Sequence, residues 1–135
     1  MSVIRMSKRR GSKSSKDAIE VVWDNLNRFM KKNKFWLHRT RPVSFERDDT
    51  YYEGFVKFTR KSEESLNAEG IGFVVRKAKG REGWEIVEIR PHIYASLKGA
   101  KIHYPGNTVV VTTRDKKTAL KIAEILTKNA LDVRR

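Results

Sequence analysis

Hydrophobic and polar positions recur with a helical period near both ends of the chain. Apolar side chains between residues 16 and 33 follow the i, i+3, i+4, i+7 spacing of one amphipathic helix, which Ser14 and Asp17 would cap. Its aromatic residues, Trp23 and Phe29, fall on the apolar face and are predicted to belong to the core. A second helix is predicted from a cap at Asp115 through Leu131.

Between these helices the apolar positions recur with a period of two, which is typical of strands. Five segments show it: residues 35–43 (stopped near Pro42), 51–60, 71–78, 84–90 and 108–114. The connections predicted between them are an acidic turn at 47–50, a polar loop at 62–70, a glycine-containing turn at 79–83 and an irregular segment at 91–107. Gly70 and Gly72 indicate a bulge or a close backbone contact.

The segment 51–60 has two different faces. Tyr52, Gly54, Val56 and Phe58 form an apolar face, which is predicted to point at the core. The alternate positions mix aromatic and charged side chains, so that face is predicted to meet solvent. Its members are Tyr51, Glu53, Phe55, Lys57 and Thr59.

The element order α-β-β-β-β-β-α predicts an α+β fold. We expect a mostly antiparallel five-stranded sheet with both amphipathic helices packed on one face and the other face open to water. Residues 1–15 are rich in Ser, Lys, Arg and Gly and predict a flexible basic tail. Residues 16–135 then form a single domain, long enough to bury a core without disulfides.

Charge narrows the class of partner. The chain has 30 Lys and Arg against 16 Asp and Glu, a formal net charge of +14, which favours a polyanion. The bases cluster in acid-free runs at residues 1–16, 28–41 and 90–114, and aromatic residues and histidines lie among those of the second and third runs. Bases beside aromatic rings suit nucleic acid, because cations meet phosphates and flat rings stack on bases. Lysine-rich surfaces also keep small proteins soluble, and aromatics in strands often form the core.

Several kinds of chemistry find no support in the sequence. Cysteine is absent, no phosphate-binding glycine motif occurs, and His38, His92 and His103 lack metal-ligand spacing, so no cofactor or metal is expected. Asp48, Asp49 and Glu53 could be clustered acids of a nuclease, but a solvated turn explains them better. We therefore expect no enzymatic activity and no catalytic residues.

We predict that the open sheet face binds nucleic acid. The candidate stacking platforms are Trp36, Tyr51, Phe55 and Trp84, each of which could instead pack in the core. The candidate basic and phosphate contacts are His38, Arg39, Arg41, Lys57, Arg76, Arg90 and Lys101, each of which could instead be solvated surface.

These features predict sequence-tolerant binding of single-stranded nucleic acid and do not choose DNA over RNA. Two alternatives stay open: a chromatin or transcription regulator that binds double-stranded DNA, and a structural component of a ribonucleoprotein. No helix-turn-helix pattern supports the duplex alternative. Aromatic residues on an open face favour single strands, because duplex bases are already stacked.

The layout resembles the ThermoDBP group of archaeal single-stranded DNA-binding proteins. The resemblance is carried by Phe29-Met30-Lys31-Lys32 at a helix end, by Phe35-Trp36-Leu37-His38-Arg39 after it, and by the aromatic and basic strands 51–60, 71–78 and 84–90. It covers the architecture of residues 16–131 and implies a cleft that pairs a basic rim with stacking residues, without catalysis. The resemblance also favours single-stranded DNA over RNA as the ligand. The long C-terminal leucine zipper of that group is not evident, so a homodimer is only one possibility. An oligonucleotide-binding barrel matches less well, because the helices flank the strands.

The expected location is the cytoplasm, in association with the nucleoid. No apolar run approaches the ~20 residues of a membrane span, and the basic N-terminus lacks the apolar stretch of a signal peptide. Glutamine is absent and 34% of residues are charged, which is typical of a thermophile.

Overall fold

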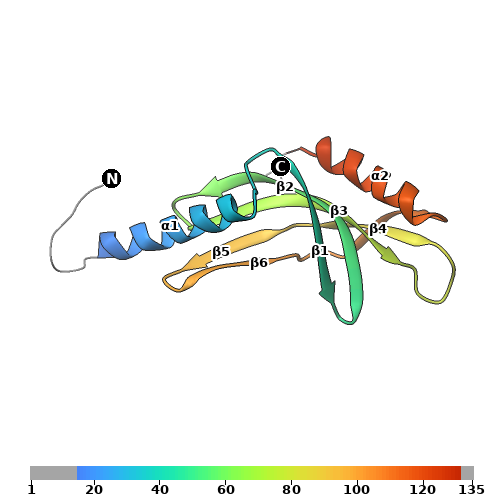
Figure 1. Cartoon of the computed structure of the whole chain (residues 1–135), viewed down its shortest axis with the longest axis horizontal. Coiled ribbons are helices and arrows are strands. Elements are labelled where there is room, and N and C mark those ends of the chain that lie inside the picture. The colour runs from blue at the N-terminus through green and yellow to red at the C-terminus, as the bar shows by residue number, and fades with distance from the viewer. Residues whose placement is uncertain (1–14, 132–135) are drawn as a thin grey trace.

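The computed structural model describes residues 15–131, which form two helices and a seven-stranded sheet (Figure 1). The helices are α1 (Ser15–Lys32) and α2 (Lys116–Lys128). The strands are β1 (Thr40–Arg47), β2 (Thr50–Ser62), β3 (Asn67–Lys77), β4 (Trp84–Ile89), β5 (His92–Ser96), β6 (Gly99–His103) and β7 (Thr108–Thr113). The α+β class is confirmed, but the prediction of five strands is wrong. The predicted basic tail, apart from Ser15, and the cap at Ser14 lie outside the described residues.

The two additional strands, β5 and β6, form a hairpin in the segment predicted to be irregular. Each has only five residues, and Ala95 and Ala100 supply weak apolar positions, so the period of two is hard to detect. The first predicted strand begins later than expected, at Thr40, because the backbone of His38 adopts φ 66°. Pro42 lies within β1 instead of ending it, which an edge strand allows.

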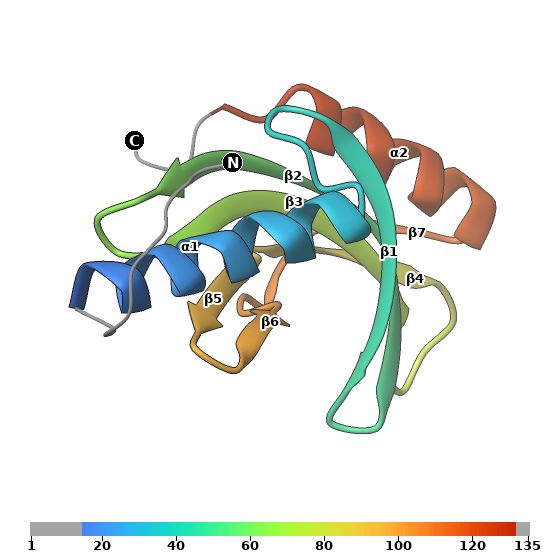
Figure 2. The ribbon, with the colours of Figure 1, turned by 60° about the vertical axis from the view of Figure 1, so that its left-hand side comes forward.

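All paired strands are antiparallel, and β3 changes partner along its length. The main path of the sheet is β1-β2-β3-β4-β7. Residues Gly72–Lys77 of β3 pair with β4, whereas Asn67–Glu69 pair with β5, which in turn pairs with β6. The sheet therefore divides at β3 into two arms, one ending at β7 and the other at β6 (Figure 2).

The division coincides with a bend. The register of β2 against β3 shifts between Phe58 and Arg60, and the Gly70 amide nearby donates to the Pro91 carbonyl at 3.0 Å. A Cβ atom on Gly70 would lie 2.4 Å from the Lys57 carbonyl oxygen, and one on Gly72 would lie 2.5 Å from that of Phe55. Both glycines thus permit close backbone contact, and the prediction made for them is confirmed.

The two helices lie on opposite faces of the sheet, so the prediction that both cover one face is wrong. In the first core, Leu26 and Met30 of α1 pack with Val74 of β3. In the second core, Ala119 and Ala123 of α2 pack with the adjacent residue Val75, which points the other way. The run Ile71–Val75 is buried throughout, as expected for a strand covered on both sides.

Strand β2 shows most clearly that the sheet is covered on both faces. Tyr52, Val56 and Phe58 are buried in the first core, as predicted. The face predicted to meet solvent is instead largely covered by α2: Phe55 packs against the second core, and Lys57 is only 8% exposed. The ammonium of Lys57 donates to the carbonyls of Lys128 and Ala130, at 3.0 and 2.7 Å.

Candidate nucleic-acid interface

Part of the sheet on the α2 side extends beyond that helix and carries polar side chains. Helix α2 packs on β1, β2, β3, β4 and β7, whereas α1 packs on the β5–β6 hairpin from the opposite side. Paired residues of antiparallel strands point to the same face, so the registers define two parallel rows of side chains there. One row is Arg60, Glu69, His92 and His103, and the other is Ser62, Asn67, Tyr94 and Lys101. We call these eight residues the open face.

Tyr94 is the prominent aromatic residue of the open face. Its side chain is 50% exposed. The ring stacks on His92 with centroids 4.8 Å apart and an interplanar angle of 14°, and it meets the edge of His103 at 5.5 Å. Both histidines thereby restrict the ring, so Tyr94 presents a flat surface that is already oriented.

A polar network holds this aromatic group in place. Glu69 bonds to Arg60 at 2.5 Å and lies 3.5 Å from Nε2 of His92. The amide nitrogen of Asn67 lies 3.3 Å from the same ring nitrogen. Because Glu69 is balanced by Arg60, the exposed Lys101 leaves the open face with a positive formal charge.

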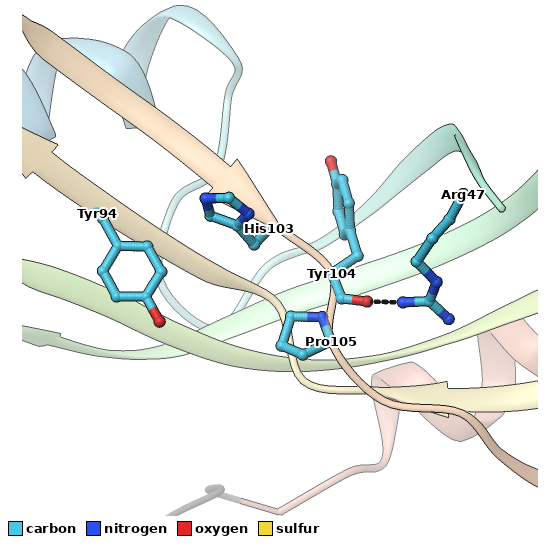
Figure 3. A pocket seen from close by; sticks show the side chains of 5 residues that line it. All are labelled: Arg47, Tyr94, His103, Tyr104 and Pro105. Atoms are coloured by element: carbon cyan, nitrogen blue, oxygen red, sulfur yellow. Dashed lines mark hydrogen bonds between the residues drawn. The ribbon is translucent and has the colours of Figure 1, made fainter.

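Two hollows border Tyr94 and His103. One, of about 450 Å³, lies beside β6 and is also lined by Arg47, Tyr104 and Pro105, as Figure 3 shows. The other, of about 380 Å³, lies on the β5–β6 hairpin. Its remaining lining residues are Ala95, Ser96, Lys98, Gly99, Ala100 and Lys101. A half-exposed aromatic ring that borders two hollows can accept flat groups, and the bordering cations can accept anions.

An aromatic and arginine cluster on the other side of the sheet supports the first hollow. Tyr104 stacks on Phe45 with centroids 4.1 Å apart, and Phe45 stacks on Tyr52 at 5.0 Å. Arg47 lies 4.9 Å from the Tyr52 ring and donates hydrogen bonds to the carbonyls of Tyr104 and Gly106. These bonds fix the segment that follows β6 against the end of β1.

Within the same cluster, the pKa of the Tyr52 phenol is lowered and the pKa of the Tyr104 phenol is raised. Burial alone would raise the pKa of Tyr52, but hydrogen bonds and charges from Arg76 and Arg47 outweigh burial and lower it. Burial raises the pKa of Tyr104. Arg76 also bonds to Glu85 at 2.9 Å and to Asn107 at 2.6 Å. Its guanidinium is therefore engaged within the fold.

The structure distributes the eleven predicted site residues over several regions. Lys101 is on the open face, and Arg90 is two residues before His92 and bonds to Glu88 at 2.5 Å. Phe55 and Lys57 lie beneath α2, and Arg76 belongs to the cluster around Tyr52. The remaining predictions in the segment before and within β1 are Trp36, His38, Arg39 and Arg41, of which the first three are exposed.

Tyr51 and Trp84 form a separate group near the start of α2. The ammonium of Lys116 lies 5.3 Å from the Trp84 ring and 6.0 Å from the Tyr51 ring, and it bonds to Glu53 at 2.9 Å. Lys77 also lies 5.7 Å from the Trp84 ring. These rings therefore already contact cations of the chain itself, whereas no such contact is found for Tyr94 within residues 15–131.

The candidate residues chosen from the sequence did not include Tyr94, His92, His103 or Arg47, although the two histidines were interpreted as surface or nucleic-acid contacts. A signal was present, since His92 and Tyr94, like Lys101 and His103, are two residues apart in the acid-free run 90–114. Residues two apart share one face of a strand, so recognising β5 and β6 would have placed all four side chains of the hairpin together.

Comparisons with known proteins give no match: no family model, curated protein or solved structure matches this chain. The resemblance to the ThermoDBP group therefore stays a prediction. Within residues 15–131, no group of three or more His, Asp or Glu side chains could hold a metal ion. No helix in that part of the chain is long and apolar enough to cross a membrane.

Proposed function

We propose that this chain binds single-stranded nucleic acid, with little sequence preference and without catalysis, on the open face. Single-stranded DNA is the first ligand to test. The observation that carries the proposal is Tyr94, a half-exposed ring oriented by His92 and His103 on an otherwise polar sheet face.

Stacking supports this function. A base stacked on an aromatic side chain contributes about 1–3 kcal/mol, and any base can provide the stacking surface. His92 stacks on Tyr94, so the exposed part of the ring is available to a base, and Tyr94 borders both hollows. Bases in a duplex are already stacked on each other, so a flat sheet surface favours a single strand.

The surrounding charges support the same function. Lys98 and Lys101 line one hollow, and Arg47 lines the other. Cations beside an exposed ring suit a sugar-phosphate backbone whose bases turn toward that ring. They lie among the bases of a chain whose net charge is +14.

Replacing Tyr94 tests the location of the site. We expect Tyr94→Ala to weaken binding of a labelled single-stranded oligonucleotide by about 5- to 150-fold, the equivalent of one lost stacking contact. Tyr51→Ala is the matched control, because Tyr51 is 51% exposed and Tyr94 is 50% exposed. Fluorescence anisotropy would give the dissociation constants, with duplex DNA and single-stranded RNA as additional ligands.

The two tyrosines separate the possible outcomes. A loss of affinity at Tyr51 alone would move the site to the group around Trp84. Equal binding of single strands and duplex, unchanged in both variants, would indicate general phosphate attraction and favour the chromatin or ribonucleoprotein alternatives.

A further inference from the structure

The two histidines of the open face occupy directly opposite positions on β5 and β6. His92 pairs with His103 in the register of the hairpin, and both rings contact Tyr94. The third histidine of the chain, His38, is exposed in the segment between α1 and β1 and lies outside this group. Histidine is the side chain whose charge changes between about pH 5 and pH 8. A change in the charge of His92 or His103 therefore acts directly beside Tyr94.

The contacts of His92 suit both of its charge states. Its Nε2 atom lies 3.3 Å from the amide nitrogen of Asn67 and 3.5 Å from a carboxylate oxygen of Glu69. A neutral ring whose Nε2 carries no proton accepts a hydrogen bond from the Asn67 amide, whereas a protonated ring donates from Nε2 to the Glu69 carboxylate. Both partners lie on β3, so protonation exchanges one for the other and leaves the ring beside Tyr94.

The other titratable and charged groups around the two histidines come from β1, β2, β3, β5 and β6 and from the end of β4. They are Arg47, Arg60, Glu69, Glu88, Arg90, Lys101 and the phenols Tyr94 and Tyr104. Glu69 is bonded to Arg60, and Glu88 is bonded to Arg90, so each carboxylate already has a cation. On the open face Arg60 and Lys101 oppose only Glu69, so its formal charge rises from +1 with neutral histidines to +3 when both are protonated.

We propose that protonation of His92 and His103 strengthens the binding of single strands to the open face, so that the affinity of this site rises as pH falls from about 8 to about 5. This inference rests on the proposed function. His103 lines both hollows, so its charge lies next to the backbone of a strand whose base stacks on Tyr94. Each histidine that meets a phosphate should raise the affinity about fivefold, as for two opposite charges in contact with water.

The pH dependence of binding tests the proposal. The ligand is a labelled oligonucleotide of thymidines, because thymine does not change charge near neutral pH. By fluorescence anisotropy, we expect the unaltered chain to bind about 5- to 25-fold more tightly at about pH 5 than at about pH 8. The double variant His92→Gln, His103→Gln should lose this ratio, and His38→Gln, which removes the remaining histidine, should keep it. The ratio is the readout, because the loss of two rings beside Tyr94 also lowers the affinity itself.

Two results would overturn the proposal: equal affinity of the unaltered chain at the two pH values, or an equal ratio in all three proteins. A second measurement needs no variant. If protonated histidines favour binding, then binding must in turn take up protons. Calorimetric titrations near neutral pH, in buffers with different heats of ionisation, would count them. We expect net uptake of protons, and binding without uptake would contradict the proposal.

Tyr94→Ala separates this inference from the proposed function. If Tyr94→Ala weakens binding at both pH values while the affinity of the unaltered chain is independent of pH, the site on the open face stands and the role of the histidines is rejected. If Tyr94→Ala has no effect at either pH value, the proposed site is itself wrong and the inference fails with it.

Discussion

At the scale of single residues, Lys57 shows how the fold can give a basic side chain a structural role. The sequence predicted a phosphate contact, but the ammonium of Lys57 is buried against the end of α2, where it bonds to the carbonyls of Lys128 and Ala130. The last carbonyls of a helix have no partner within the helix and carry partial negative charge, so a cation there is favourable.

Lys57→Met should therefore lower the free energy of unfolding. Methionine keeps most of the buried stem but removes the charge-assisted hydrogen bonds, and we expect a loss of about 1.5–3 kcal/mol. Urea denaturation would measure it. Lys121→Met, on an exposed position of α2, is the matched control and should have little effect. If both variants unfold at the same urea concentration, the bonds to the helix end do not stabilise the fold.

At the scale of elements, α2 begins as the sequence predicted. Asp115 is the N-cap, and its carboxylate accepts hydrogen bonds from the amide and the hydroxyl of Thr118, both at 2.8 Å. These bonds from Thr118 hold the pKa of Asp115 below its ordinary value. A carboxyl group with a lowered pKa binds its proton more weakly in the folded state, so its stabilising effect is present when it is ionised.

We expect the contribution of Asp115 to be complete above its unfolded pKa and to be lost as pH falls through its lower folded pKa. In Asp115→Asn the amide oxygen can still cap the helix but does not titrate. The difference in stability between the unaltered chain and this variant should therefore shrink from neutral to strongly acidic pH. Thermal unfolding at several pH values would measure it, and Asp24→Asn on α1 controls for the loss of one negative charge. A difference that is constant with pH would refute this role.

The helices and the long strands could be predicted because their patterns extend over many residues. Alternation separated Tyr52 from Phe55 correctly, but it could not show that α2 covers the second face, because mixed faces occur both in solvent and beneath a helix. The apolar run Ile71–Val75 was the available sign of burial on both sides. The β5–β6 hairpin was missed because its inward positions include small alanines, and most of the open face was missed with it.

At the scale of the whole molecule, the net charge favours a polyanion as partner but does not indicate where on the surface a polyanion would bind. The excess of bases is spread over the whole chain. The open face has only a few of these bases, and they lie near the exposed ring of Tyr94. General attraction by the net charge of +14 and local binding at Tyr94 differ in how salt affects them. For each phosphate contact, the logarithm of the binding constant for a single strand falls by about 0.7 when the salt concentration rises tenfold.

The salt dependence of binding therefore separates the two kinds of attraction. If Lys98 and Lys101 are the principal phosphate contacts, the logarithm of the binding constant should fall with the logarithm of salt concentration with a slope of about −1.4. Lys101→Ala should make the slope shallower by about 0.7, because one phosphate contact is removed. Tyr94→Ala should weaken binding at every salt concentration and leave the slope unchanged, because stacking releases no counterions. Anisotropy titrations across a salt series would measure all three slopes. A much steeper slope that neither substitution alters would mean that the whole basic surface, and not the open face, attracts the nucleic acid.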